Sequence, residues 1–157
     1  MKVLLICTAN ICRSPMAQVV TTELAARAGL ARQLRFESAG TQASRSSEPA
    51  DPRARTALAR RDYPVAKTRS RRITGEDFVR FDLILAMDQS NLDDLRDICP
   101  PAHLGKLRLF LDFAPQLGIR EVPDPYYGGP QGFDRVLDLC EAAAKGLLDH
   151  IRPAQSP

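Results

Sequence analysis

Cys7 and Arg13 stand near the start of the chain with five residues between them, in the segment Cys7–Pro15. An arginine can hold two oxygens of a tetrahedral oxyanion from the side while a thiol lies below the central atom. Backbone N–H groups of a tight loop, and of a helix that starts directly after it, also bind anions. We therefore expect a phosphate-binding loop in which Cys7 is the nucleophile and Arg13 holds the phosphate.

The residues inside this loop are expected to contact the substrate or to keep the loop in shape. The loop contains no glycine, so Asn10 is expected to take a left-handed backbone conformation. The Ser14 hydroxyl can donate a hydrogen bond to the Cys7 sulfur, and the positive surroundings favour a thiolate at neutral pH. No histidine is near in the sequence, which disfavours the dyad of a cysteine protease. The predicted substrate-binding residues of the loop are Thr8, Ala9, Asn10, Ile11, Cys12 and Ser14.

Asp124 is the candidate general acid. Thiolate attack on a phosphate monoester also requires a proton for the leaving oxygen. Asp124 lies between Pro123 and Pro125, which restrict its backbone, and Tyr126 and Tyr127 follow it. We expect the two tyrosines to line the substrate site, where they could stack on an aromatic leaving group. Taken alone, the aspartate would suggest an ordinary turn and the tyrosines a surface patch.

Strands and helices alternate along the chain and must position these groups. Val3–Ile6 is continuously apolar, as in a buried parallel strand, while Ser14 and Pro15 are typical of a helix start and Gly29 of its end. The alternation predicts an α/β domain with a parallel sheet, whose ligands bind beyond the carboxyl ends of the strands. The expected strands are 3–6, 34–39, 82–87 and 106–111; the expected helices are 14–28, 51–61, a short turn after 74, 88–98 and 133–151; a long loop covers 112–132 and a frayed tail 153–157.

Length and composition fit one globular domain, with 157 residues of which 44% are hydrophobic and 26% charged. The apolar N-terminal run stops at Cys7, too early for a secretory signal, and no other stretch could span a bilayer, so we expect a cytoplasmic protein. Its cysteines should then be thiols, and Cys99 and Cys140 are expected to be simply buried. Neither His103 nor His150 is spaced with them for a zinc site, so no metal is expected.

Positive charge is concentrated in the middle of the chain. Residues 45–80 hold 10 Lys and Arg against 5 Asp and Glu, whereas the whole chain has a net charge of only +3. Such an excess could steer an acidic or phosphorylated partner, or it could be a solvated helix face and loop. No nucleic-acid motif or aromatic platform accompanies it, which disfavours a nucleic-acid partner.

At four motifs the chain resembles the low-molecular-weight protein tyrosine phosphatase family. The match is close at Cys7–Pro15, Ser38–Thr41, Ala86–Asp88 and Asp124–Tyr127, and the chain length and element order agree too. The resemblance implies a single α/β domain over residues 1–152, with a four-stranded parallel sheet, helices on both faces and the phosphate-binding loop after the first strand. Residues 153–157 would form a flexible tail.

The resemblance also implies an activity: hydrolysis of phosphotyrosine and aryl phosphate monoesters through a phosphocysteine. Cys7 would be the nucleophile, Arg13 the phosphate clamp and Asp124 the general acid. No metal or cofactor is expected. The partner would be a phosphotyrosine-containing protein, with a bacterial tyrosine kinase as one candidate, and neither nucleic-acid binding nor membrane insertion is expected. The residues implied to shape the loop are Asn10, Ser14 and Ser38.

Three further points concern the loop. Family members can form a reversible disulfide between the two loop cysteines, here Cys7 and Cys12, which would protect Cys7 from over-oxidation. The family often has His-x-Ala-Arg where this chain has Thr68-Arg69-Ser70-Arg71. That histidine helps to brace the loop asparagine, so Asn10 lacks this support. Ala9 stands where many members carry glycine.

Three other interpretations are compatible with the sequence. A thiol-dependent arsenate reductase resembles the family in fold and loop, but it needs further cysteines to relay a disulfide, and Cys99 and Cys140 are not an obvious pair. A non-catalytic phosphate- or phosphotyrosine-binding module would keep Arg13 but would need neither Cys7 nor Asp124. The simplest alternative is a structural cysteine at a strand end, with the arginine in a salt bridge.

Overall fold

Four parallel strands form one sheet in the order β2-β1-β3-β4 in the computed structural model, which describes residues 1–155 and the side chains of residues 1–151. β1 lies between β2 and β3, and its apolar residues Val3–Ile6 are fully buried. All strand pairs are parallel, which confirms the predicted fold class. The strands are β1 Lys2–Cys7, β2 Arg35–Gly40, β3 Leu83–Ala86 and β4 Leu107–Leu109.

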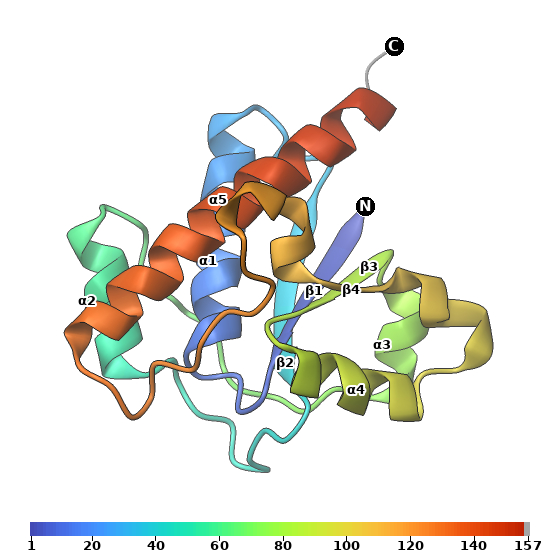
Figure 1. Ribbon diagram of the computed structural model, residues 1–157, viewed down its shortest axis with the longest axis horizontal. Helices are drawn as coiled ribbons and strands as arrows, with labels where there is room; N and C mark the ends of the chain where they lie inside the picture. The colour runs from blue at the N-terminus through green and yellow to red at the C-terminus, as the bar shows by residue number, and fades with distance from the viewer. Residues whose placement is uncertain (156–157) are drawn as a thin grey trace.

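Helices cover both faces of the sheet (Figure 1). Side chains of β1 alternate between two cores: Leu5 and Cys7 pack with α1, α2 and α5, whereas Leu4 and Ile6 pack with α3 and α4. No helix within residues 1–155 is both long enough and apolar enough to cross a bilayer. The helices are α1 Arg13–Arg27, α2 Pro52–Arg60, α3 Gly75–Arg80, α4 Gln89–Ile98 and α5 Pro130–Gln155, and the 3-10 helices are η1 Pro101–Lys106, η2 Phe110–Phe113 and η3 Pro115–Leu117.

Three predicted boundaries differ from the structure by more than one residue. The last strand ends at Leu109, because its partner β3 ends opposite it at Ala86 and offers no further backbone groups to pair. The predicted loop at 112–132 contains η3, and α5 begins inside it at Pro130, since the first position of a helix tolerates proline. α5 also includes residues 153–155 of the predicted tail, whereas residues 156–157 lie outside the described part of the chain.

Three loops meet at the carboxyl end of the sheet, at the lower end of Figure 1. Segment 41–51 is fixed to both sides of the loop after β1, since Gln42 N donates to Thr8 O at 2.9 Å and Asp51 N to Ile11 O at 2.8 Å. At Gly40 a Cβ atom would lie 2.5 Å from Thr8 O, so only glycine allows this approach. The loop that carries the predicted acid is held at Val122, whose N donates to Met87 O at 2.8 Å.

Candidate active site

Cys7 is the last residue of β1, and its sulfur lies among hydrogen-bond donors. Ser14 Oγ is 3.0 Å from the sulfur, and Asn10 N donates to it at 3.3 Å. Ser14 Oγ also accepts a hydrogen bond from Asn10 Nδ2 at 2.8 Å, which leaves the serine's own hydrogen free to point at the sulfur. These two groups present the positive ends of an O–H and an N–H dipole to the sulfur.

Ser14, expected from its residue type to cap the helix start, is not the N-cap of α1, which is Cys12, two residues earlier. α1 begins at Arg13 after Cys12, and Ser14 lies in the first turn. The serine cannot cap the helix because its hydroxyl is engaged with Cys7 and Asn10. Pro15 is therefore the third residue of the helix instead of the first.

Asn10 takes the left-handed conformation that was predicted, with φ 60°. Its side chain is braced from three sides: Nδ2 donates to Ser14 Oγ and to Ser38 Oγ, at 3.0 Å for the latter, and Oδ1 accepts from Arg71 N at 3.0 Å. Ser38 in turn donates to Gln18 Oε1 at 2.7 Å. A backbone N–H thus supports the asparagine in place of the missing histidine.

Arg13 is fixed by groups that the sequence did not connect to it. Its side chain is 4% exposed, and Nη1 donates to Asp88 Oδ2 at 2.6 Å and to Val122 O at 3.0 Å. Nη2 donates to Thr8 Oγ1 at 3.4 Å and lies 4.0 Å from Asp124 Oδ2. Nη1 is therefore used for positioning, whereas Nη2 has only weak contacts and remains available to an anion.

Both carboxylate oxygens of Asp88 are engaged. Oδ1 accepts from Asn91 N at 2.8 Å and so caps α4, while Oδ2 orients Arg13. Asn91 also donates from Nδ2 to Thr8 Oγ1 at 3.0 Å, which fixes the first loop residue after Cys7. The available signal was the position of Asp88 just after β3, because β3 neighbours β1 and both strands end at the same edge.

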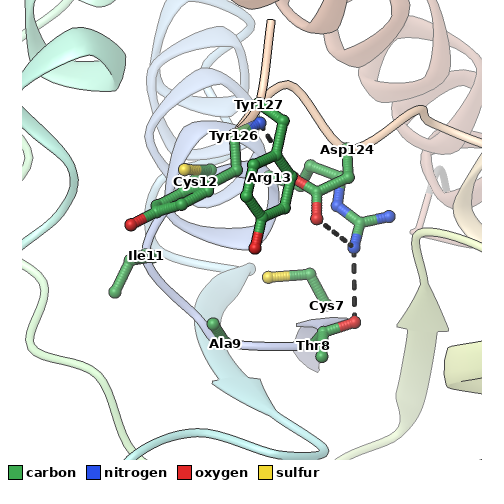
Figure 2. Close-up of a pocket in the computed structure, with 9 residues that line it drawn as sticks. All are labelled: Cys7, Thr8, Ala9, Ile11, Cys12, Arg13, Asp124, Tyr126 and Tyr127. Carbon is green, nitrogen blue, oxygen red and sulfur yellow. Dashed lines mark hydrogen bonds and ion pairs between the residues drawn. The ribbon is translucent and has the colours of Figure 1, made fainter.

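These groups surround a cavity of about 340 Å³ (Figure 2). Figure 2 shows Asp124 and the two tyrosines across the cavity from Thr8 and Ala9. Three predicted site residues, Asn10, Ser14 and Ser38, do not line the cavity but are buried. The lining residues are Cys7, Thr8, Ala9, Ile11, Cys12, Arg13, Asp124, Tyr126 and Tyr127.

Asp124 lies at the mouth of the cavity, with its side chain 51% exposed. Its Oδ1 accepts from Tyr126 N at 3.0 Å, which closes a short turn and orients the carboxyl group. The rings of Tyr126 and Tyr127 meet edge to face with centroids 4.9 Å apart, and Tyr127 is 93% exposed. Asp124 and the two tyrosines thus belong to one turn.

Arg53, at the start of α2, holds this turn and was missed in the sequence. Its guanidinium lies 5.1 Å from the ring centre of Tyr126 and 4.9 Å from that of Phe133, and it donates to Tyr126 O at 2.8 Å. Asp51 accepts from Arg53 at 3.1 and 3.0 Å, and this hydrogen bonding lowers the pKa of Asp51. The sequence showed Asp51 only as a helix start, so nothing linked Arg53 to the distant tyrosine.

Two of the four cysteines, Cys7 and Cys12, line the cavity, and the other two, Cys99 and Cys140, lie in the cores away from it. Cys12 lines the cavity, and burial, with a smaller effect of the Asp51 carboxylate, raises the pKa of its thiol to about 12. Cys99 and Cys140 are buried as predicted, and desolvation raises the pKa of both thiols. Within the described residues no group of three His, Cys, Asp or Glu side chains could hold a metal ion.

Comparison with known proteins agrees with this geometry. The sequence model of the family "Low molecular weight phosphotyrosine protein phosphatase" matches residues 2–156. The chain belongs to the low-molecular-weight protein tyrosine phosphatase family. A putative member of the family from Synechocystis is 41% identical over 152 residues, with 96% of each chain covered. A member from Streptomyces coelicolor is 40% identical over 154 residues, with 96% of this chain and 93% of the relative covered.

Solved structures extend the comparison. A protein tyrosine phosphatase from Entamoeba histolytica, with Hepes in its active site, superposes with a TM-score of 0.94 at 38% identity over 99% of both chains. The arginine phosphatase YwlE, solved as a variant with a phosphorylated active-site serine, superposes with a TM-score of 0.88 at 25% identity, covering 99% of this phosphatase and 98% of YwlE. The same fold therefore occurs in one protein named a tyrosine phosphatase and in another named an arginine phosphatase.

Asp77 supports the phosphate loop of this phosphatase indirectly, through Arg71, and its pKa makes the stability of the fold depend on pH. Its carboxylate is buried and accepts from both terminal nitrogens of Arg71, at 2.9 and 3.0 Å, and from Thr74 N at 2.8 Å. Burial alone would raise the pKa of Asp77, but these hydrogen bonds outweigh it and hold the pKa below its usual value. Asp77 thereby fixes Arg71, whose backbone N–H braces Asn10.

We expect Asp77→Asn to lower the free energy of unfolding by about 1–3 kcal/mol at pH 7. A depressed pKa in the folded state stabilises above the unfolded value of about 3.9, and this contribution is lost as the pH falls through the folded pKa. Urea unfolding of wild type and variant should therefore show a gap that narrows below about pH 4. Glu76→Gln, an exposed neighbour, is the control. An equal difference in the free energy of unfolding at pH 7 and below about pH 4 would contradict this role of Asp77.

Proposed function

We propose that the protein hydrolyses phosphotyrosine and other aryl phosphate monoesters through a phosphocysteine on Cys7. The thiolate attacks phosphorus, an S–P bond forms as the bond to the leaving oxygen breaks, and Asp124 gives that oxygen its proton. Water then attacks the phosphocysteine while Asp124 accepts a proton from it, and cleavage of the S–P bond releases phosphate and the thiolate. Neither step uses a metal or a cofactor.

The observation that carries this proposal is the surroundings of the Cys7 sulfur. Ser14 and Asn10 place donors 3.0 and 3.3 Å from it, in a cavity that Arg13 and Asp124 also line. A cysteine that only ended a strand would need none of these groups. A non-catalytic phosphate-binding module would need Arg13 but not an aspartate at the mouth of the cavity.

Arg13 supports phosphoryl transfer because its position is fixed before a substrate arrives. Asp88 and Val122 O hold Nη1, and Nη2 is directed to the side of the cavity where Thr8 and Asp124 lie. A preorganised donor stabilises developing negative charge without having to reorganise during the reaction. Backbone N–H groups of the loop would hold the remaining phosphate oxygens.

The cavity wall supports an aromatic leaving group. Tyr126 and Tyr127, together with Ile11 of the loop itself, give the cavity apolar surface, which suits a phenyl ring. The physiological partner proposed is a phosphotyrosine-containing protein, with a bacterial tyrosine kinase as one candidate. We also propose a cytoplasmic location, which all four cysteines as free thiols support.

The arsenate reductase hypothesis is less well supported. Cys140, on α5, packs in the core on one face of the sheet, whereas Cys99 packs in the core on the other face. The sheet therefore lies between the two thiols, and they could not pair to relay a disulfide without a large rearrangement.

A substrate panel tests the proposal. We expect turnover of phosphotyrosine and p-nitrophenyl phosphate, and little or none of phosphoserine, whose leaving group has no ring to contact the aromatic wall. Phosphoarginine is included because the related YwlE is an arginine phosphatase. Preference for phosphoarginine, or arsenate reduction with thioredoxin in the absence of phosphatase activity, would contradict the proposal.

A further inference from the structure

Three arginines lie along one short exposed segment beside the active site. Arg72 Nη2 donates to Ala43 O at 3.1 Å, and Arg69 Nη2 donates to Ser47 O at 2.8 Å. Arg45 belongs to the segment itself, between these two carbonyl groups, and is exposed. Arg45, Arg69 and Arg72 are called the arginine rim below.

The segment that carries the arginine rim borders the phosphate loop. Its two ends hydrogen-bond to the loop at Thr8 O and Ile11 O, on either side of Ala9, and all three of these loop residues line the cavity. Figure 1 shows the segment after β2 next to the loop after β1, at the end of the molecule that holds the active site. A peptide whose phosphotyrosine enters the cavity can therefore pass the rim.

The positive charge of the rim is not neutralised by the fold. Within the described residues, Arg69 and Arg72 donate only to backbone carbonyl groups, and Arg45 makes no hydrogen bond or ion pair. Four other arginines of the basic stretch 45–80 do have carboxylate partners: Arg53, Arg61, Arg71 and Arg80. The segment has two carboxylates: Asp51 pairs with Arg53, and Glu48 forms no ion pair within the described residues. Three arginines against Glu48 leave a net positive charge there.

We propose that the arginine rim binds acidic side chains that flank the phosphotyrosine, so that the preferred substrate is a phosphotyrosyl segment rich in Asp or Glu. This inference rests on the proposed function and refines its substrate class. Extended residues advance about 3.3–3.6 Å each, which brings side chains within a few positions of the phosphotyrosine to the rim. Exposed pairs of this kind are individually weak and screened by salt, so the effect comes from the cluster.

The test compares two triple variants that remove the same charge. The rim variant neutralises the arginine rim and carries Arg45→Gln, Arg69→Gln and Arg72→Gln. The control variant carries Arg32→Gln, Arg35→Gln and Arg60→Gln. Arg32 and Arg35 lie at the opposite end of the sheet. Each is assayed with p-nitrophenyl phosphate and with two phosphotyrosyl peptides, one with Asp and Glu flanks and one with Asn and Gln in their place.

We expect wild type and control to prefer the acidic peptide through KM. The rim variant should raise KM for that peptide by roughly tenfold, with kcat unchanged and with little effect on the neutral peptide or on p-nitrophenyl phosphate. The wild-type preference should shrink at high salt. Arg45→Glu alone should shift KM in the same direction. Because Arg45 is exposed and its side chain makes no hydrogen bond or ion pair within the described residues, this variant should fold normally.

Equal kcat/KM of wild type for both peptides would overturn the inference, as would the same KM change in rim and control variants. In either case, cleavage of the peptides would leave the proposed function standing. Cleavage of neither peptide by wild type would overturn both. Unchanged peptide kinetics in the rim variant, with loss of binding to phosphatidylserine-containing vesicles, would also overturn the inference and would assign the rim to a membrane surface.

Discussion

Replacing Cys7 with serine should reduce turnover of p-nitrophenyl phosphate by at least about 10⁴-fold, whereas binding of inorganic phosphate should change little. A serine hydroxyl is not ionised at neutral pH, so the variant loses the nucleophile. Arg13, which is proposed to hold the phosphate together with the loop N–H groups, keeps its contacts to Asp88 and Val122 O. Steady-state kinetics and phosphate titration measure the two effects separately.

The matched control for this substitution is Cys99→Ser. Cys99 packs in the core on the other face of the sheet, away from the cavity, so this variant should keep its activity. Substantial activity of the Cys7→Ser variant would contradict the thiolate mechanism. Loss of phosphate binding together with turnover would instead show that the loop depends on the sulfur for its shape.

Asp124→Asn should slow turnover in a way that depends on the leaving group. An asparagine cannot supply a proton, so a phenyl ester should lose about 10²–10⁴-fold in kcat, whereas p-nitrophenyl phosphate, whose leaving group needs less help, should lose much less. The side chain is half exposed and makes one hydrogen bond to the backbone, which an amide oxygen can also accept. The substitution therefore should not disturb the fold.

Asp97→Asn, at an exposed position of α4, is the control for the loss of one carboxylate and should leave both substrates unaffected. A plot of kcat against leaving-group pKa gives the comparison. Equal losses for good and poor leaving groups would argue against Asp124 as the acid and would point to a role in binding.

The sequence predicted those parts of the site that depend on local chemistry. The strand, the loop and the helix start are contiguous, so the positions of Cys7 and Arg13 followed from their spacing. The left-handed backbone of Asn10 followed from the lack of glycine in the loop. The sheet followed from the alternation of buried and amphipathic segments.

What the sequence did not predict depends on contacts between distant segments. Arg13 and Asp88 are 75 residues apart, and Arg53 and Tyr126 are 73 apart, so no local pattern pairs them. The brace of Asn10 by the Arg71 N–H is a backbone contact, which side-chain identity does not reveal. The wrong N-cap had a related cause, since the Ser14 hydroxyl has a partner in β1 that competes with capping.

Quantitative trapping of the reaction intermediate tests the central claim most directly. An aryl phosphate would be turned over by the wild-type protein, quenched in acid within the first turnover and digested, and the phosphorylated peptide would be identified by mass spectrometry. We predict one phosphoryl group on the sulfur of Cys7, which forms with release of the first equivalent of phenol. A phosphoryl group on any other residue, or none during full turnover, would contradict the account.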